Sequence, residues 1–120
     1  MALIHHLVPA ADWAALAPGQ PYLPAAYASD GFIHCTTQPA VLLEVANRFY
    51  QGSAGQYLVL DIDPELVTAE VRLEAPVPPA LPGSPLAGVL FPHIYGPLNR
   101  EAIVAVRAAQ RAPDGRFLQV

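Results

Sequence analysis

The distribution of proline constrains the fold of this chain more than any other feature. Fourteen of the 120 residues are proline, roughly twice the usual share. Proline lacks a backbone N–H and interrupts helices and interior strands, so long ordered loops are expected between short elements. Five prolines and two glycines fall within residues 75–88, which predicts a long loop of the kind that often has a function. A chain of 120 residues with this organisation fits a single domain.

Charge and composition exclude several classes of protein. Six basic residues, all arginine, against ten acidic residues give a net charge of −4, which argues against a nucleic-acid partner. The absence of lysine excludes Schiff-base chemistry. A single cysteine, Cys35, forms neither an internal disulfide nor a thiolate zinc cage. No apolar run is long enough to span a membrane and no cationic signal peptide opens the chain, so we expect a cytoplasmic protein without a membrane partner.

Apolar runs and periodic patterns predict an α+β (mixed α/β) domain. Strands are predicted at residues 3–8, 31–35, 57–62, 71–74, 102–107 and 116–120. A short helix is predicted at residues 10–16, and a second helix begins near Pro39 with one apolar face formed by Leu42, Val45, Ala46 and Phe49. Thr37 is the predicted cap of this second helix. Residues 91–99, with two prolines, a histidine and a tyrosine, are too specific for an ordinary connector.

The four histidines occur at three places, within apolar segments: His5-His6, His34 and His93. Adjacent residues of a strand face opposite sides, so only one of His5 and His6 can face a given cleft, and Cys35 should point away from His34. Cys35 is therefore expected to be a core residue, with a reactive thiol as the alternative. One histidine from each place could also ligate zinc, although no local metal motif is present, so a metal-dependent hydrolase with a three-histidine site is an alternative function.

Further polar residues could hold a ligand or take part in a reaction. Thr36, beside the start of the second predicted helix, could bind an anionic group such as a pyrophosphate, with a plain helix cap as the alternative. Glu74 at a strand end could accept a ribose hydroxyl or stabilise a developing cation, with a solvated strand end as the alternative. Tyr95 could stack on a ring or donate a hydrogen bond. Histidines titrate near neutral pH and could carry protons.

Several motifs together resemble those of the DUF952 family over nearly the whole chain. They are Ile4-His5-His6-Leu7, Asp30-Gly31-Phe32-Ile33-His34-Cys35-Thr36, Ala46-Asn47-Arg48-Phe49-Tyr50, Leu58-Val59-Leu60-Asp61-Ile62-Asp63 and Phe91-Pro92-His93-Ile94-Tyr95-Gly96-Pro97-Leu98. The G-F-I-H-C-T and F-P-H-I-Y-G segments are the most specific of these. The resemblance implies a single DUF952-like domain over residues 1–120.

The same resemblance implies an ADP-ribosyltransferase-like fold, a compact domain of small split β-sheets with two or three helices and a cleft for NAD. The implied function is binding of NAD or a related nucleotide, a small-molecule ligand, with transfer or hydrolysis of ADP-ribose. Carried over by motif, the catalytic residues would be His34, His93 and Glu74, and the cofactor-binding residues would be His6, Thr36 and Tyr95. The sequence departs from the common pattern because it lacks an obvious late catalytic glutamate. Besides the metal-dependent hydrolase, a non-catalytic module that binds a small ligand is an alternative.

Overall fold

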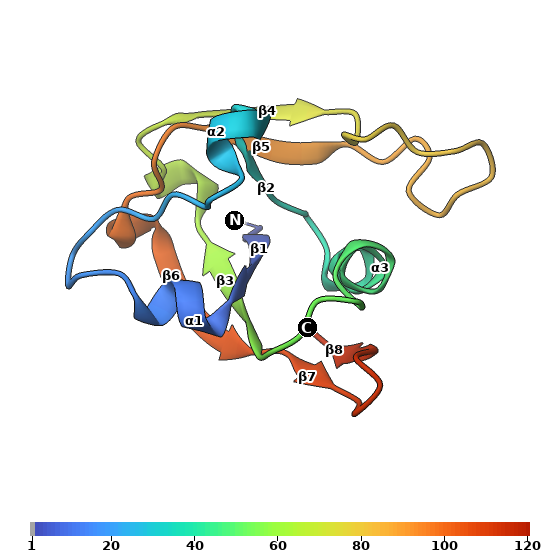
Figure 1. Cartoon of the computed structure of the whole chain (residues 1–120). Helices are drawn as coiled ribbons and strands as arrows, with labels where there is room; N and C mark the ends of the chain where they lie inside the picture. The colour runs from blue at the N-terminus through green and yellow to red at the C-terminus, as the bar shows by residue number, and fades with distance from the viewer. Residues whose placement is uncertain (1) are drawn as a thin grey trace.

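Three small antiparallel sheets form the framework of the protein in a computed structural model that describes residues 2–120 (Figure 1). The first sheet has the order β1-β3-β6 and contains β1 (Ile4–Pro9), β3 (Tyr57–Ile62) and β6 (Ile103–Ala108). The second has the order β2-β5-β4 and contains β2 (Ile33–His34), β5 (Phe91–Tyr95) and β4 (Glu70–Glu74). A hairpin of β7 (Gln110–Arg111) and β8 (Phe117–Gln119) is the third. The predicted α+β domain with split small sheets is confirmed.

The helices are short, as the proline content predicts. They are α1 (Ala10–Ala14), α2 (Tyr27–Asp30), α3 (Pro39–Phe49) and the 3-10 turns η1 (Pro64–Leu66) and η2 (Arg100–Ala102). The longest, α3, packs against β1 and β8 and buries Leu42 and Ala46 as predicted. Phe49, at the end of the predicted apolar face, is half exposed. Within residues 2–120, no helix has the length and apolar character needed to cross a membrane.

The core has two parts because alternate residues of the first sheet face opposite sides. Ile4 and Val8 of β1 pack with Ile94 of β5 in one cluster of buried side chains. Leu7, on the other side of β1, packs with Val59 of β3 and with α3. The alternation predicted for residues 3–8 is therefore confirmed, and it places the neighbours His5 and His6 on opposite sides of β1.

Two predictions around the second sheet need correction. Residues 91–99 contain β5, the central strand of that sheet, which the sequence patterns did not predict because Pro92 argues against an interior strand. Pro92 is tolerated because its carbonyl still accepts a hydrogen bond from the Cys35 N–H at 3.0 Å. The prediction that Thr37 caps α3 is wrong, since the cap position is Gln38 and no side chain caps the helix.

Thr36 joins the two larger sheets. Its N–H donates to the His5 carbonyl and its carbonyl accepts from the His5 N–H, both at 2.8 Å. His34 lies two residues before Thr36 and is paired with His93 across β2 and β5, so these three side chains share one side. This side is the one covered by α3.

The predicted long loop between β4 and β5 is present and extends beyond the second sheet (Figure 1). Residues 75–90 contain no helix or strand, and most of their side chains are exposed. Leu86 is an exception, because it is buried and returns toward α3 and the sheets. The loop therefore reaches over the same side of the molecule that carries the paired histidines.

Candidate functional site

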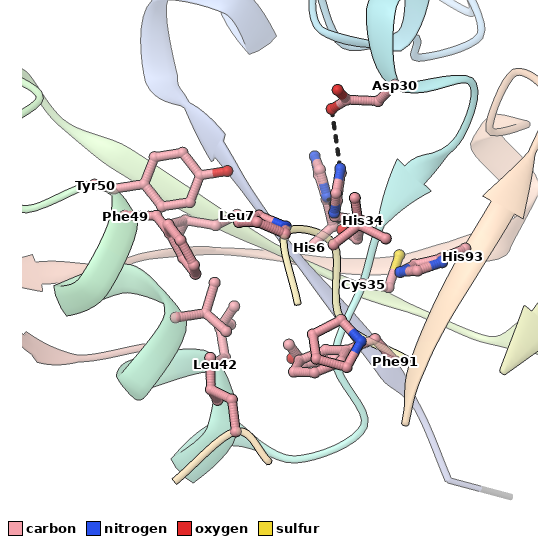
Figure 2. A pocket seen from close by; sticks show the side chains of 16 residues that line it. His6, Leu7, Asp30, His34, Cys35, Leu42, Phe49, Tyr50, Phe91 and His93 are labelled. Atoms are coloured by element: carbon pink, nitrogen blue, oxygen red, sulfur yellow. Dashed lines mark hydrogen bonds and ion pairs between the residues drawn. The ribbon is translucent and has the colours of Figure 1, made fainter. Parts of the chain in front are cut away.

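A cavity of 380 Å³ lies between α3 and the strands β1, β2 and β5 (Figure 2). Leu7 of β1, Leu42 of α3 and Phe91 form part of a largely apolar wall. Residues 76–78 and Leu86 of the long loop close another side. The cavity is of a size typical of small-ligand sites, which span roughly 300–1,000 Å³. Four of the six predicted site residues line it, namely His6, His34, Thr36 and His93.

His34 and His93 form the polar centre of this cavity. They are directly opposite each other in the register of β2 and β5, and their ring centroids are 5.6 Å apart. Phe32 stacks on the His93 ring at 4.0 Å between centroids and restricts its orientation. The F-I-H spacing of strand β2 produces this stack because Phe32 and His34 share one side of the strand. The two histidines predicted as catalytic are thus brought together.

Each of these histidines has a carboxylate partner. His34 Nε2 donates to Asp30 Oδ2 at 2.9 Å, and both side chains are partly exposed (Figure 2). His93 Nδ1 donates to Glu74 Oε1 at 2.8 Å, and the His93 side chain is only 1% exposed. The Tyr95 hydroxyl donates to the same Glu74 oxygen. The structure therefore contains two histidine–carboxylate pairs at one cavity.

The electrostatics of the more buried pair favour a neutral imidazole beside an ionised carboxylate. Burial lowers the pKa of His93, and the hydrogen bond to Glu74 opposes this only in part. Hydrogen bonds from Tyr95 and His93 hold the pKa of Glu74 below its usual range. At neutral pH His93 therefore has a lone pair available and Glu74 is negatively charged.

His6 lines the cavity, but its polar atoms already have partners. Its Nδ1 donates to the His34 carbonyl at 2.5 Å, and its Nε2 accepts from the Tyr22 hydroxyl at 2.8 Å. Burial lowers the pKa of His6 to about 4, so the ring is neutral at physiological pH. His6 therefore connects β1 to β2 and offers the cavity the surface of its ring.

Thr36 lies in the cavity wall and is 3% exposed. Its Oγ1 is buried and has no hydrogen-bond partner among residues 2–120. The backbone of Thr36 bridges to His5, two residues before the cap position of α3, and no side chain caps that helix. An unpartnered buried hydroxyl beside a cavity is a natural contact for a polar group of a ligand.

Glu74 and Tyr95, predicted to act on the ligand, lie beside the cavity and do not line it. Glu74 is connected to the site through its hydrogen bond with His93, and Tyr95 through its hydrogen bond with Glu74. Asp30, which does line the cavity, was missed by the sequence reasoning. The available signal was the segment Asp30-Gly31-Phe32-Ile33-His34, in which Gly31 ends α2 with a positive φ of 82° and lets Asp30 approach His34.

The alternatives left open by the sequence find little support in this geometry. In the part of the chain that the structure describes, no three histidine, cysteine or carboxylate side chains are grouped as metal ligands. Both ring nitrogens of His6 are engaged, which removes one ligand of the three-histidine set. Burial raises the pKa of the Cys35 thiol, so this cysteine is a core residue, as expected, and not an activated thiolate.

The fold and site define a small α+β domain with a histidine-centred cavity, and comparison with known proteins identifies its family. Residues 7–106 match the family described as "Protein of unknown function (DUF952)", and the chain belongs to that family. The predicted membership is therefore confirmed. A search of curated proteins gives no significant match.

Solved structures of protein CC0527 from Caulobacter crescentus are similar to this chain. Its crystal structure has a TM-score of 0.74 and 27% sequence identity, covering 97% of this chain and 93% of that chain. Its solution NMR structure has a TM-score of 0.68 and 28% identity, covering 96% and 90%. These similarities establish a shared fold over almost the whole chain, and they name no ligand or reaction.

Proposed function

We propose that this protein is an enzyme that binds NAD or a related nucleotide by its nicotinamide–ribose end and transfers or hydrolyses ADP-ribose. The observation that carries the proposal is the pair His34 and His93, opposite each other at one wall of the cavity, each with its own carboxylate. The choice of ligand is supported by the grouping of the DUF952 family with ADP-ribosyltransferase-like domains that the sequence resemblance implies.

The cavity suits one end of such a nucleotide. Its apolar wall, including Phe49 and Phe91, can accept a flat ring, and the hydroxyl of Thr36 can bond to a polar substituent. None of the lining residues is arginine or lysine. A pyrophosphate is therefore better placed in solvent at the mouth than inside, since buried phosphates require cationic or N–H partners.

The residues present can assist rupture of the nicotinamide–ribose bond. In this reaction the bonding electron pair leaves with the nicotinamide nitrogen, positive charge develops on the ribose, and an acceptor oxygen forms the new bond and loses a proton. Neutral His93 can take that proton, and ionised Glu74 stabilises the resulting imidazolium. The carboxylate of Asp30, beside His34, supplies negative charge near the cavity.

The test combines thermal unfolding with an assay of nicotinamide release. NAD and nicotinamide mononucleotide should raise the unfolding midpoint of the wild-type protein, because a ligand that binds only the folded state stabilises it. His34→Gln and His93→Gln should reduce this shift, and His93→Gln should also abolish nicotinamide release. His5→Gln makes the same chemical change outside the cavity lining and should bind NAD normally. Equal midpoint shifts in wild type and both cavity variants would exclude this site.

A binding module without turnover is the second candidate, favoured by the largely apolar wall of the cavity. It predicts a midpoint shift with a nucleotide but no release of nicotinamide, in the presence or absence of added acceptors. The same assay therefore distinguishes the two functions.

A further inference from the structure

Two polar side chains beside the cavity have no contact with its interior, yet both are connected to His93. Glu74 Oε1 accepts hydrogen bonds from His93 Nδ1, at 2.8 Å, and from the Tyr95 hydroxyl. The Arg72 guanidinium lies 4.5 Å from the centre of the Tyr95 ring and is itself bound to Glu70. These contacts form a short chain of interactions on the side of His93 away from the cavity.

We propose that Glu74 and Tyr95 are positioning residues that hold His93 as the Nδ1–H tautomer, so that Nε2 is the proton acceptor available to the cavity. An ionised carboxylate only accepts hydrogen bonds, so the hydrogen must lie on Nδ1 of His93. A neutral imidazole then has its lone pair on Nε2. Tyr95 gives Glu74 a second hydrogen bond, which restricts a side chain that is 35% exposed and would otherwise be held by His93 alone.

The second histidine of the cavity is held in the reverse way. His34 uses Nε2 to donate to Asp30, and its Nδ1 has no partner among residues 2–120. The two histidines therefore offer different ring nitrogens and are not interchangeable. The Asp30–His34 pair is also more exposed to water than the Glu74–His93 pair, so its carboxylate has a weaker influence.

Four charged or titratable groups lie around His93, and two of them, Glu74 and His34, shift its pKa. Glu74 and Arg72 face it from β4, Tyr95 from its own strand and His34 from β2. Burial and the nearby His34 lower the pKa of His93, whereas Glu74 raises it. Loss of the Glu74 charge removes the opposing contribution, so His93 should accept a proton only at lower pH than in the wild type.

The test is nitrogen-15 NMR of the imidazole rings during a pH titration, which needs no ligand. Wild-type His93 should give the signals of an Nδ1–H tautomer. Glu74→Gln, whose amide oxygen can still accept a hydrogen bond, should titrate at lower pH than the wild type. Glu74→Ala should also lose the tautomer preference, and Tyr95→Phe should weaken it. Glu70→Gln, an exposed carboxylate on the same strand bound to Arg72, is the matched control and should leave the His93 tautomer unchanged.

A wild-type tautomer and titration in both Glu74 variants would overturn the inference. The inference concerns the site of the proposed function, but the two can fail separately. If the NMR result holds and no nucleotide binds, the positioning role stands and the proposed function is wrong. If NAD is turned over, Glu74→Gln should move the pH profile of kcat with little change in KM, because Glu74 does not line the cavity.

Discussion

Thr36 provides a prediction in which stability and binding change in opposite directions. Its side chain is 3% exposed, and its Oγ1 has no hydrogen-bond partner within residues 2–120. Valine has nearly the same shape and replaces the hydroxyl by a methyl group. Thr36→Val should therefore stabilise the free protein and weaken its complex with a ligand that bonds to the hydroxyl.

The magnitude follows from the cost of an unpaired buried hydroxyl, about 1–3 kcal/mol. We use the lower end of this range, about 1 kcal/mol, as the smallest gain in the free energy of unfolding that the substitution should give. With an unfolding entropy of about 2.1 cal/mol/K per residue, the 120-residue chain should unfold about 4 °C higher. Loss of one hydrogen bond to the ligand should weaken binding about tenfold.

Calorimetric unfolding and isothermal titration with NAD measure the two effects on the same preparation. Thr37→Val is the matched control, because this neighbouring side chain is exposed and should change the free energy of unfolding by no more than about 0.5 kcal/mol. A lower unfolding midpoint for Thr36→Val would show that the Thr36 hydroxyl stabilises the free protein, contrary to this prediction. A higher midpoint with unchanged binding would show that the hydroxyl does not contact the ligand.

Two further predictions concern stability. Asp61 accepts hydrogen bonds from His5 and Arg107, and the Arg107 guanidinium holds the pKa of Asp61 below its usual range. Asp61→Asn should therefore lower the free energy of unfolding by about 2 kcal/mol at pH 7. The loss is smaller than for a fully buried ion pair because the Arg107 side chain is 41% exposed. This cost should shrink in calorimetry as the pH falls below about 4, because Asp61 of the unfolded chain binds its proton there, whereas folded Asp61, with its lowered pKa, binds it only at lower pH. Burial lowers the pKa of His6 to about 4 from its usual 6.5, so the unfolded chain binds the proton first and the wild type should lose stability as pH falls between these values. In urea unfolding at several pH values, the free energy of unfolding of His6→Asn should depend less on pH than that of the wild type. An equal change with pH in both proteins would contradict this prediction.

Local sequence patterns predicted most of the framework. The apolar runs gave β1 and β3, helical periodicity gave α3, and strand alternation correctly separated His5 from His6 and Cys35 from His34. These features are decided by burial on one side of a single element, which a short stretch of sequence encodes.

The features that the sequence did not predict depend on contacts between segments that are distant along the chain. Strand β5 contains Pro92 at an interior position, and only the pairing with β2 shows that the Pro92 carbonyl still accepts a hydrogen bond from the Cys35 N–H. The partnership of Asp30 with His34 depends on a turn at Gly31, and that of Glu74 with His93 on the register between β4 and β5. Their positions along the chain do not reveal that Asp30 lines the cavity, whereas Glu74 is bound to His93 and lies outside the cavity lining.

The most direct test of the proposed site is a titration of the histidine-labelled protein with NAD, followed by NMR of the four imidazole rings. We expect saturable shifts of the His34 and His93 signals, whereas the signal of His5, which lies outside the cavity lining, should not change. Absence of any shift at saturating NAD, or a shift confined to His5, would contradict the assignment of this cavity as a nucleotide site.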